Sequence, residues 1–211
     1  EYMSHTSNTI YVAFKVKKTN KDFLKDCNII IWTTTPWTIP ANKALAFNNS
    51  IEYSVLEIDD LEFFKEKKIV VAKNLVNSII QECNIKNYKE IRTFKGSEFE
   101  GTICSHPFIK MKFDYDVPML DASFVSLDQG TGIVHCAPSH GPDDFNLCLK
   151  NNIPSLYTVD NAGLYTDEIP FFTKTHIFKA DPIVIDKLKE QKKLLKNDSL
   201  NHSYPHSWRS K

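Results

Sequence analysis

Hydrophobic and polar residues alternate in five short stretches of the chain, a spacing typical of strands that bury one face. These stretches are enriched in β-branched and aromatic residues, and their ends carry the Asn, Asp, Gly and Pro that turns use. The pattern predicts strands over residues 9–16, 28–35, 52–58, 68–72 and 132–137.

Three other segments place apolar residues at helical spacing, and they predict helices over residues 74–82, 143–151 and 181–195. In the last of these, Pro182 suits the first helical position, because the N–H that proline lacks would have no partner there. We find no internal repeat and no long linker. Many short strands with few helices indicate a mainly β protein with flanking helices (α+β), built as one domain over residues 1–211 on a closed or nearly closed β-barrel.

Composition narrows the class of protein. The 211 residues include 26 Lys and Arg against 26 Asp and Glu, so the net charge is zero and no overall basic field attracts nucleic acid. At 42% hydrophobic residues the chain can bury a core, which excludes disordered classes. No apolar run approaches the roughly 18 residues of a membrane span, and the start of the chain lacks the layout of a secretory signal, so we expect a cytoplasmic protein without membrane contact. Five cysteines without a C-x-x-C pair predict neither a disulfide framework nor a thiolate zinc site.

The first candidate for chemistry is the segment WTTTPWTIPAN, residues 32–42. It holds four threonines within six residues, namely Thr33, Thr34, Thr35 and Thr38. Prolines with fixed φ angles stiffen the backbone beneath these hydroxyls, so the strip can bind polar ligand atoms. The alternative is a strand that runs into an irregular loop, since threonine favours strands and proline ends them.

The second candidate is the segment GTGIVHCAPSHGPDDF, residues 130–145. A glycine turn feeds a short apolar strand, after which the chain enters a helix near Pro142. This order brings His135, His140, Asp143 and Asp144 to one end of the strand. One aspartate at a helix start is explained as a cap or a partner of the helix dipole, but a cap does not require two.

Other chemistries fit the second segment less well. A dinucleotide loop of the G-x-G-x-x-G type is disfavoured, because His135 occupies its last glycine position. A zinc site from His135, His140 and Asp144 has suitable residue types but no recognised spacing. A thiol hydrolase that uses Cys136 with His140 remains an alternative, although a buried, inert cysteine fits a strand position beside His135 better.

Together the two segments resemble the editing domain inserted in isoleucyl-tRNA synthetases. That family carries W-T-T-T-P-W-T-[LI]-P-A-N and G-T-G-x-V-H-x-A-P-x-H-G-x-D-D-[FY], and weaker similarity at residues 96–108, 125–132, 178–184 and 204–211 extends the resemblance over nearly the whole chain. Valyl and leucyl editing domains typically place lysine or methionine where His135 stands, and the HGPDDF wording resembles the bacterial or organellar branch. The chain lacks the HIGH and KMSKS signatures of the synthetase core, so we do not expect it to activate amino acids.

The resemblance implies a proofreading function. In this enzyme family one missing methylene is worth only about 1–3 kcal/mol, too little to reject valine, so a second site must hydrolyse the mistake. The implied partner is the 3′ acceptor end of tRNA(Ile) with misattached valine, whose ester would be cleaved after transfer, with valyl-adenylate as a further substrate. Residues 1–15 and 200–211 would be stem segments that lead to the rest of the synthetase chain. We expect a monomeric fragment that needs no cofactor and no metal.

The resemblance also assigns roles. Asp144 matches the anchor of the substrate amino group, and the implied catalytic residues are Asp144, Thr33, Thr34, Thr35 and His135. The implied substrate-binding residues are Thr38, Asn42, Trp37, His140, Asp143 and Trp208. Two other functions stay open at this stage: a non-catalytic module that binds the tRNA acceptor end, and an editing domain of the valyl or leucyl type.

Overall fold

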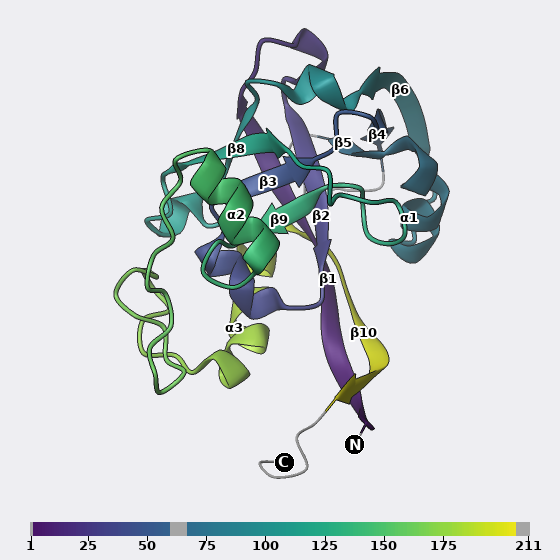
Figure 1. Cartoon of the computed structure of the whole chain (residues 1–211). Helices are drawn as coiled ribbons and strands as arrows, with labels where there is room; N and C mark the ends of the chain where they lie inside the picture. The colour runs from purple at the N-terminus through teal and green to yellow at the C-terminus, as the bar shows by residue number, and fades with distance from the viewer. Residues whose placement is uncertain (1, 60–66, 206–211) are drawn as a thin grey trace.

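The computed structural model describes residues 2–59 and 67–205 and shows a mainly β molecule with helices on both sides (Figure 1). The strands are β1 (Tyr2–Lys18), β2 (Cys27–Thr33), β3 (Ala44–Phe47), β4 (Glu52–Ile58), β5 (Lys68–Ala72), β6 (Tyr88–Lys95), β7 (Ile103–Ser105), β8 (Asp116–Asp121), β9 (Val134–Cys136) and β10 (Leu194–Pro205). The α-helices are α1 (Val76–Glu82), α2 (Pro142–Lys150) and α3 (Ile177–Glu190). Short 3₁₀-helices are η1 (Asp22–Leu24), η2 (Pro36–Ala41), η3 (Lys73–Leu75), η4 (Gly96–Phe99) and η5 (Ile109–Met111).

The strands form one mixed sheet in the order β6-β4-β5-β2-β1-β7-β8-β3-β9, with β10 paired to β1. Only the β2–β5 and β3–β8 pairs are parallel among the described ladders. The sheet curls until β9 lies beside β2, but the described strands form no ladder between β6 and β9 at its two ends. The mainly β, α+β class is confirmed, whereas the sheet is open and the closed barrel is not confirmed.

A long two-stranded ribbon projects from the body of the molecule (Figure 1). It consists of the outer part of β1 and the whole of β10, which pair antiparallel from Tyr2 with Pro205 to Val12 with Leu194. Residues 2–7 and 200–205, which belong to the two expected stem segments (residues 1–15 and 200–211), therefore lie side by side. Residues 206–211, which include Trp208, lie outside the described part of the chain.

The core is buried on both faces of the sheet. On β1, Ile10, Val12 and Phe14 point to the main core, while Tyr11 and Ala13 point to a second core beneath α1. This alternation follows from the two-residue period of a strand. Because both faces are covered, the apolar side chains of the strands are largely removed from water. This stabilises the fold by about 1.5–3 kcal/mol for each fully buried large aliphatic side chain.

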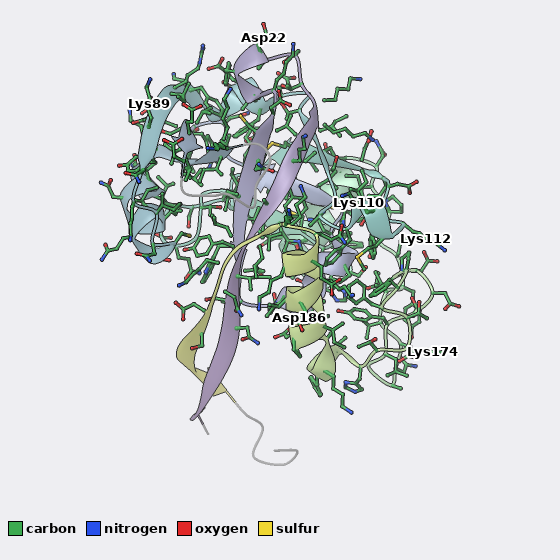
Figure 2. All side chains as sticks on the ribbon, turned by 180° about the vertical axis from the view of Figure 1, so that it is seen from behind. Asp22, Lys89, Lys110, Lys112, Lys174 and Asp186 are labelled. Atoms are coloured by element: carbon green, nitrogen blue, oxygen red, sulfur yellow. The ribbon has the colours of Figure 1, made fainter. Side chains whose placement is uncertain are left out.

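Helices α2 and α3 cover opposite sides of the molecule. Helix α2 lies in front of β3 and β9 in Figure 1, and its Leu147 and Cys148 pack on a small cluster with Ala44, Ala46 and Cys136. Helix α3 lies on the other side, as the view from behind in Figure 2 shows, and its apolar face joins the main core. Among the described residues no helix is long and apolar enough to cross a membrane.

The segments predicted as strands all form strands, although residues 34–35 leave β2 and β9 keeps only three residues. The third helix is shifted relative to the prediction of residues 181–195. It begins after His176, whose Nδ1 accepts the N–H of Phe178 at 3.2 Å, so Pro182 lies inside the helix rather than at its first position. It ends before Lys192, whose left-handed φ of 56° turns the chain into β10.

Candidate functional site

A pocket of about 200 Å³ opens between the end of β2, η2, β9 and the start of α2. It is lined by Trp32, Thr33, Thr35, Thr38, Val134, His135, Ala137, His140 and Asp144. The two segments that sequence analysis singled out therefore meet in one cavity, although about a hundred residues separate them along the chain. Strand β3 brings them together, because it follows η2 and pairs directly with β9.

The threonine hydroxyls are fixed by the backbone around them. Strand β2 ends at Thr33, and Pro36 begins η2, where its missing N–H costs nothing. In the connection, Thr33 Oγ1 accepts the backbone N–H of Thr35 at 3.1 Å, and the two hydroxyl oxygens lie 3.2 Å apart. Thr38 Oγ1 donates to the carbonyl of Thr35 at 2.9 Å. The strip is thus a turn whose side chains point in set directions.

His135 forms the buried wall of the pocket. Its Nε2 lies 2.8 Å from Thr38 Oγ1, and its Nδ1 lies 3.0 Å from Asn42 Nδ2. Burial lowers the pKa of His135 to about 4, and the neighbouring His140 adds to the effect. The imidazole is therefore neutral at physiological pH and is held from both sides.

Asp144 is the acidic group of the pocket. It is the third residue of α2, and its side chain turns back so that Oδ2 accepts the N–H of Ala137 at 2.8 Å. Burial raises the pKa of this carboxyl, and the charge of Asp143 adds to the rise, while the bond from Ala137 opposes it. Gly141 leaves room for this arrangement, since a Cβ there would come within 3.2 Å of Asp144 Cγ.

The rim of the pocket is tied to the loop that follows α2. His140 Nε2 lies 3.0 Å from Thr158 Oγ1, and its ring packs edge-on to the ring of Trp37 at 4.8 Å between centroids. Burial lowers the pKa of His140. Ser139 donates to the carbonyl of Leu156 at 2.6 Å, which fastens the same loop a second time.

Of the residues predicted to form the site, the structure brings six together in the pocket and places four others outside its lining. Those that line the pocket are Thr33, Thr35, Thr38, His135, His140 and Asp144. Thr34 and Trp37 are half-buried beside it, Asp143 is exposed on α2, and Trp208 lies outside the described residues. Asn42 is fully buried behind His135, so it does not reach a ligand in the pocket.

Sequence reasoning missed two kinds of residue. Trp32, Val134 and Ala137 line the pocket, yet within the motifs they look like spacers between polar residues. Asp181 and Tyr165 hold η2 from outside, because Asp181 Oδ1 accepts the N–H of Trp37 at 3.0 Å and the Tyr165 hydroxyl donates to the Trp37 carbonyl. No local pattern signals these last contacts, since their partners lie 144 and 128 residues away.

The alternative chemistries fit the geometry poorly. Both ring nitrogens of His135 are engaged by Thr38 and Asn42, so this side chain offers no free ligand atom to zinc. The described residues contain no cluster of three or more His, Cys, Asp or Glu that is suited to hold a metal ion. Cys136 is fully buried on the α2 side of β9, and burial raises the pKa of its thiol far above the usual value, which does not suit a nucleophile.

Residues 6–197 match the family described as "Leucyl-tRNA synthetase, editing domain". Over its whole length the chain is 64% identical to an isoleucine–tRNA ligase of Pelagibacter ubique and covers 23% of that protein. It is 40% identical to the isoleucine–tRNA ligase of Gluconobacter oxydans, of which it covers 24%. The chain thus spans about a quarter of the length of the curated relatives that it matches.

Solved structures share the fold at low sequence identity. The crystal structure of GlLeuRS-CP1 superposes with a TM-score of 0.67 at 13% identity, and covers 89% of this chain and 99% of that one. The editing domain of the Plasmodium knowlesi cytosolic leucyl-tRNA synthetase gives a TM-score of 0.64 at 12% identity, with 97% and 98% covered. The chain therefore belongs to the aminoacyl-tRNA synthetase editing-domain family, in the branch of the isoleucyl enzymes.

Proposed function

We propose that this chain hydrolyses the ester that joins valine to the 3′ end of tRNA(Ile), as the post-transfer editing site of an isoleucyl-tRNA synthetase. One observation carries the proposal: the half-buried carboxylate of Asp144 shares a cavity of about 200 Å³ with the hydroxyls of Thr33, Thr35 and Thr38. An aminoacyl ester needs a partner for its cationic amine and a held water beside its carbonyl.

Asp144 is the proposed amine anchor. It is the one acidic side chain that lines the pocket, and although one of its oxygens accepts the N–H of Ala137, a carboxylate has further lone pairs for a ligand. A charge-assisted hydrogen bond between an ammonium group and a carboxylate is about twice as strong as a neutral one. Partial burial strengthens the attraction, because water screens the pair less.

The threonine hydroxyls are the proposed holders of water and carbonyl. A hydroxyl both donates and accepts, so Thr33 and Thr35 can bind a water and the developing oxyanion together. Thr35 lines the pocket and is exposed, so water can reach its hydroxyl. The ester is activated relative to an amide, so we propose attack by positioned water without a covalent intermediate, a metal or a cofactor.

The far wall supports selection by size. His135 is held at both nitrogens and therefore cannot rotate away to admit a larger side chain. Valine fits against it, and the extra methylene of isoleucine would have to displace it. The rest of the enzyme would hold the tRNA body, because a chain of zero net charge binds phosphates weakly.

The test is release of valine from valyl-tRNA(Ile) by the chain, with and without Asp144→Ala. We expect the wild type to release valine faster than isoleucine, and Asp144→Ala to slow release by about a hundredfold or more, as for loss of a charged contact at a reacting centre. Asp121→Ala is the matched control, since Asp121 also accepts a backbone N–H, that of Asn49 at 2.8 Å, but lies outside the pocket lining.

Three outcomes would contradict the proposal in different ways. Undiminished hydrolysis by Asp144→Ala would refute the anchor. Binding of valyl-tRNA(Ile) without release of valine by the wild type would favour the non-catalytic acceptor-end module. Faster release of threonine or norvaline from their esters would favour editing of the valyl or leucyl type.

A further inference from the structure

A row of three polar side chains runs from the pocket into the interior: Thr38 and His135 line the pocket, and Asn42 lies behind His135. Asn42 contacts His135, His135 contacts Thr38, and Thr38 contacts the backbone of Thr35. Asn42 is 0% exposed and does not line the pocket, so its chemistry reaches a substrate only through its neighbours. The directions of these hydrogen bonds can be worked out one after another.

The first direction is fixed by a backbone carbonyl. Asn42 Nδ2 lies 2.9 Å from the carbonyl oxygen of Ala44, which can only accept, so this end of the amide must be the NH₂ group. The same NH₂ group faces His135 Nδ1 at 3.0 Å. Its second hydrogen therefore points at Nδ1, and Nδ1 must accept.

The remaining directions follow from the neutral imidazole. A neutral histidine whose Nδ1 accepts carries its proton on Nε2. That N–H donates to Thr38 Oγ1 at 2.8 Å, and the hydroxyl hydrogen of Thr38 is given to the carbonyl of Thr35 at 2.9 Å. Thr38 keeps one free lone pair for the pocket.

We propose that Asn42 is a positioning residue that locks His135 in the Nε2–H form, so that His135 serves the site as a fixed donor rather than as a base. The proposal rests on the editing function given above and adds to it the donor and acceptor roles in the hydrogen bonds that link Asn42, His135 and Thr38. It also implies that Thr38 offers a ligand an acceptor, which suits the hydrogens of a bound water or of the substrate amine.

The unpartnered oxygen of Asn42 supports this assignment. Asn42 Oδ1 is buried and has no hydrogen-bond partner among the described residues, which is a costly arrangement for a side chain that only fills space. The cost is explained if the position needs an amide donor aimed at His135. Independently, burial lowers the pKa of His135 to about 4, which keeps the ring neutral. Only a neutral imidazole has two tautomers, of which Asn42 can select one.

The direct test is the ring ¹⁵N spectrum of histidine-labelled chain, with His135 assigned by its absence in His135→Gln. We expect Nε2 to be protonated and Nδ1 unprotonated in the wild type. Asn42→Asp replaces the NH₂ group by an acceptor of similar size, and we expect the proton of His135 to move to Nδ1. A wild-type Nδ1–H form, or an unchanged tautomer in Asn42→Asp, would overturn the proposal.

Deacylation of valyl-tRNA(Ile) gives the second readout. We expect Asn42→Asp and Asn42→Ala to lower kcat by about tenfold or more with a smaller change in KM, since a wrong histidine tautomer damages the reacting geometry more than binding. Asn48→Ala is the matched control at the other end of β3, where the amide of Asn48 donates to the carbonyl of Val125 at 3.2 Å and faces no histidine. Equal loss in all three variants would overturn the positioning role. An inactive wild type with the expected tautomer would instead refute only the proposed function.

Discussion

The carboxylate of Asp144 has both an electrostatic and a structural role at the start of α2. An acidic residue in the first turn of α2 interacts favourably with the positive end of the helix dipole, whatever else it does. Here the side chain also turns back to accept the N–H of Ala137, so it joins the helix start to the end of β9. The contact aims the carboxylate into the pocket, and its exact aim depends on the space that Gly141 leaves free.

We expect Gly141→Ala to lower deacylation of valyl-tRNA(Ile) by about tenfold while the fold is kept. The backbone of Gly141 is extended, with a φ of −149°, so alanine is tolerated there. The added Cβ would meet Asp144 Cγ at 3.2 Å and push the carboxylate by a few tenths of an ångström, and displacements of about 1 Å cost roughly a hundredfold in rate. Kinetics beside a thermal unfolding curve check this. A full-rate variant would show that the carboxylate tolerates the shift.

At the residue scale, the sequence identified the segments that form the pocket but not the position of each residue within it. The motifs correctly placed His135 and Asp144 on one cavity, because the strand-to-helix order forces them to one end of β9. They could not show that Asn42 lies behind His135, since this depends on the pairing of β3 with β9. Asp143, expected to bind substrate, is exposed and does not line the pocket as Asp144 does, because adjacent residues of a helix point about 100° apart.

Among the elements, η2 is the one whose position decides the shape of the pocket. It carries Thr38 and is followed directly by Asn42, and short bonds such as that from Thr38 N–H to the Thr35 carbonyl at 3.0 Å stabilise it internally. Two contacts from outside fix its place: Asp181 of α3 accepts the N–H of Trp37, and the hydroxyl of Tyr165 donates to the Trp37 carbonyl. The loop after α2 and helix α3 thus act as a clamp on the site.

We expect Tyr165→Phe to loosen η2 and to lower the free energy of unfolding by about 1–3 kcal/mol, because the Trp37 carbonyl loses its donor in a buried place. Hydrogen exchange of the Thr38 and Asn42 amides should become faster, and kcat/KM for valyl-tRNA(Ile) should fall with it. If exchange rose equally throughout the sheet, the clamp would be only a general contribution to stability.

Strands β3, β6, β7 and β10 were missed by sequence reasoning, for different physical reasons. Strands β3 and β7 have only four and three residues, too short for alternation to be recognised. Strand β6 lies at the edge of the sheet with most of its side chains exposed, so it lacks an apolar face. Strand β10 begins with Leu194 and Leu195, which also complete a helical stripe, and only the left-handed Lys192 decides between the two.

Over the whole molecule, charges of both signs are spread without a dominant field. Figure 2 shows this on one side, where Asp22 of η1, Lys89 of β6, Asp186 of α3, and Lys110 and Lys112 at η5 point outward. The described ion pairs are mostly exposed, such as Lys25 with Asp22 at 2.6 Å, and exposed pairs contribute little to stability. Stability must therefore come mainly from the buried interior, where two histidines are enclosed.

We expect the free energy of unfolding to fall as the pH is lowered from about 6.5, because His106 and His135 are buried in neutral form. Burial lowers their pKa values to about 3 and about 4, whereas in the unfolded chain they titrate near 6.5. Below that pH the unfolded state takes up protons that the folded state refuses, so the contribution is complete above about pH 6.5 and is lost toward pH 4 and 3. At 1.36 kcal/mol per pH unit the loss is about 2 kcal/mol for each histidine at pH 5.

Urea unfolding between about pH 7.5 and pH 5 measures this slope, and His106→Gln should roughly halve it. His106 is the better residue to replace, because it bonds the backbone of Ile39 and Phe108 at 3.1 Å each and does not line the pocket. Burial raises the pKa values of the Asp144 and Asp181 carboxyls. These two groups act in the opposite direction, since a folded state that holds a proton more tightly gains stability on acidification. A stability that stayed level over this range would mean that both imidazoles accept a proton without leaving the core.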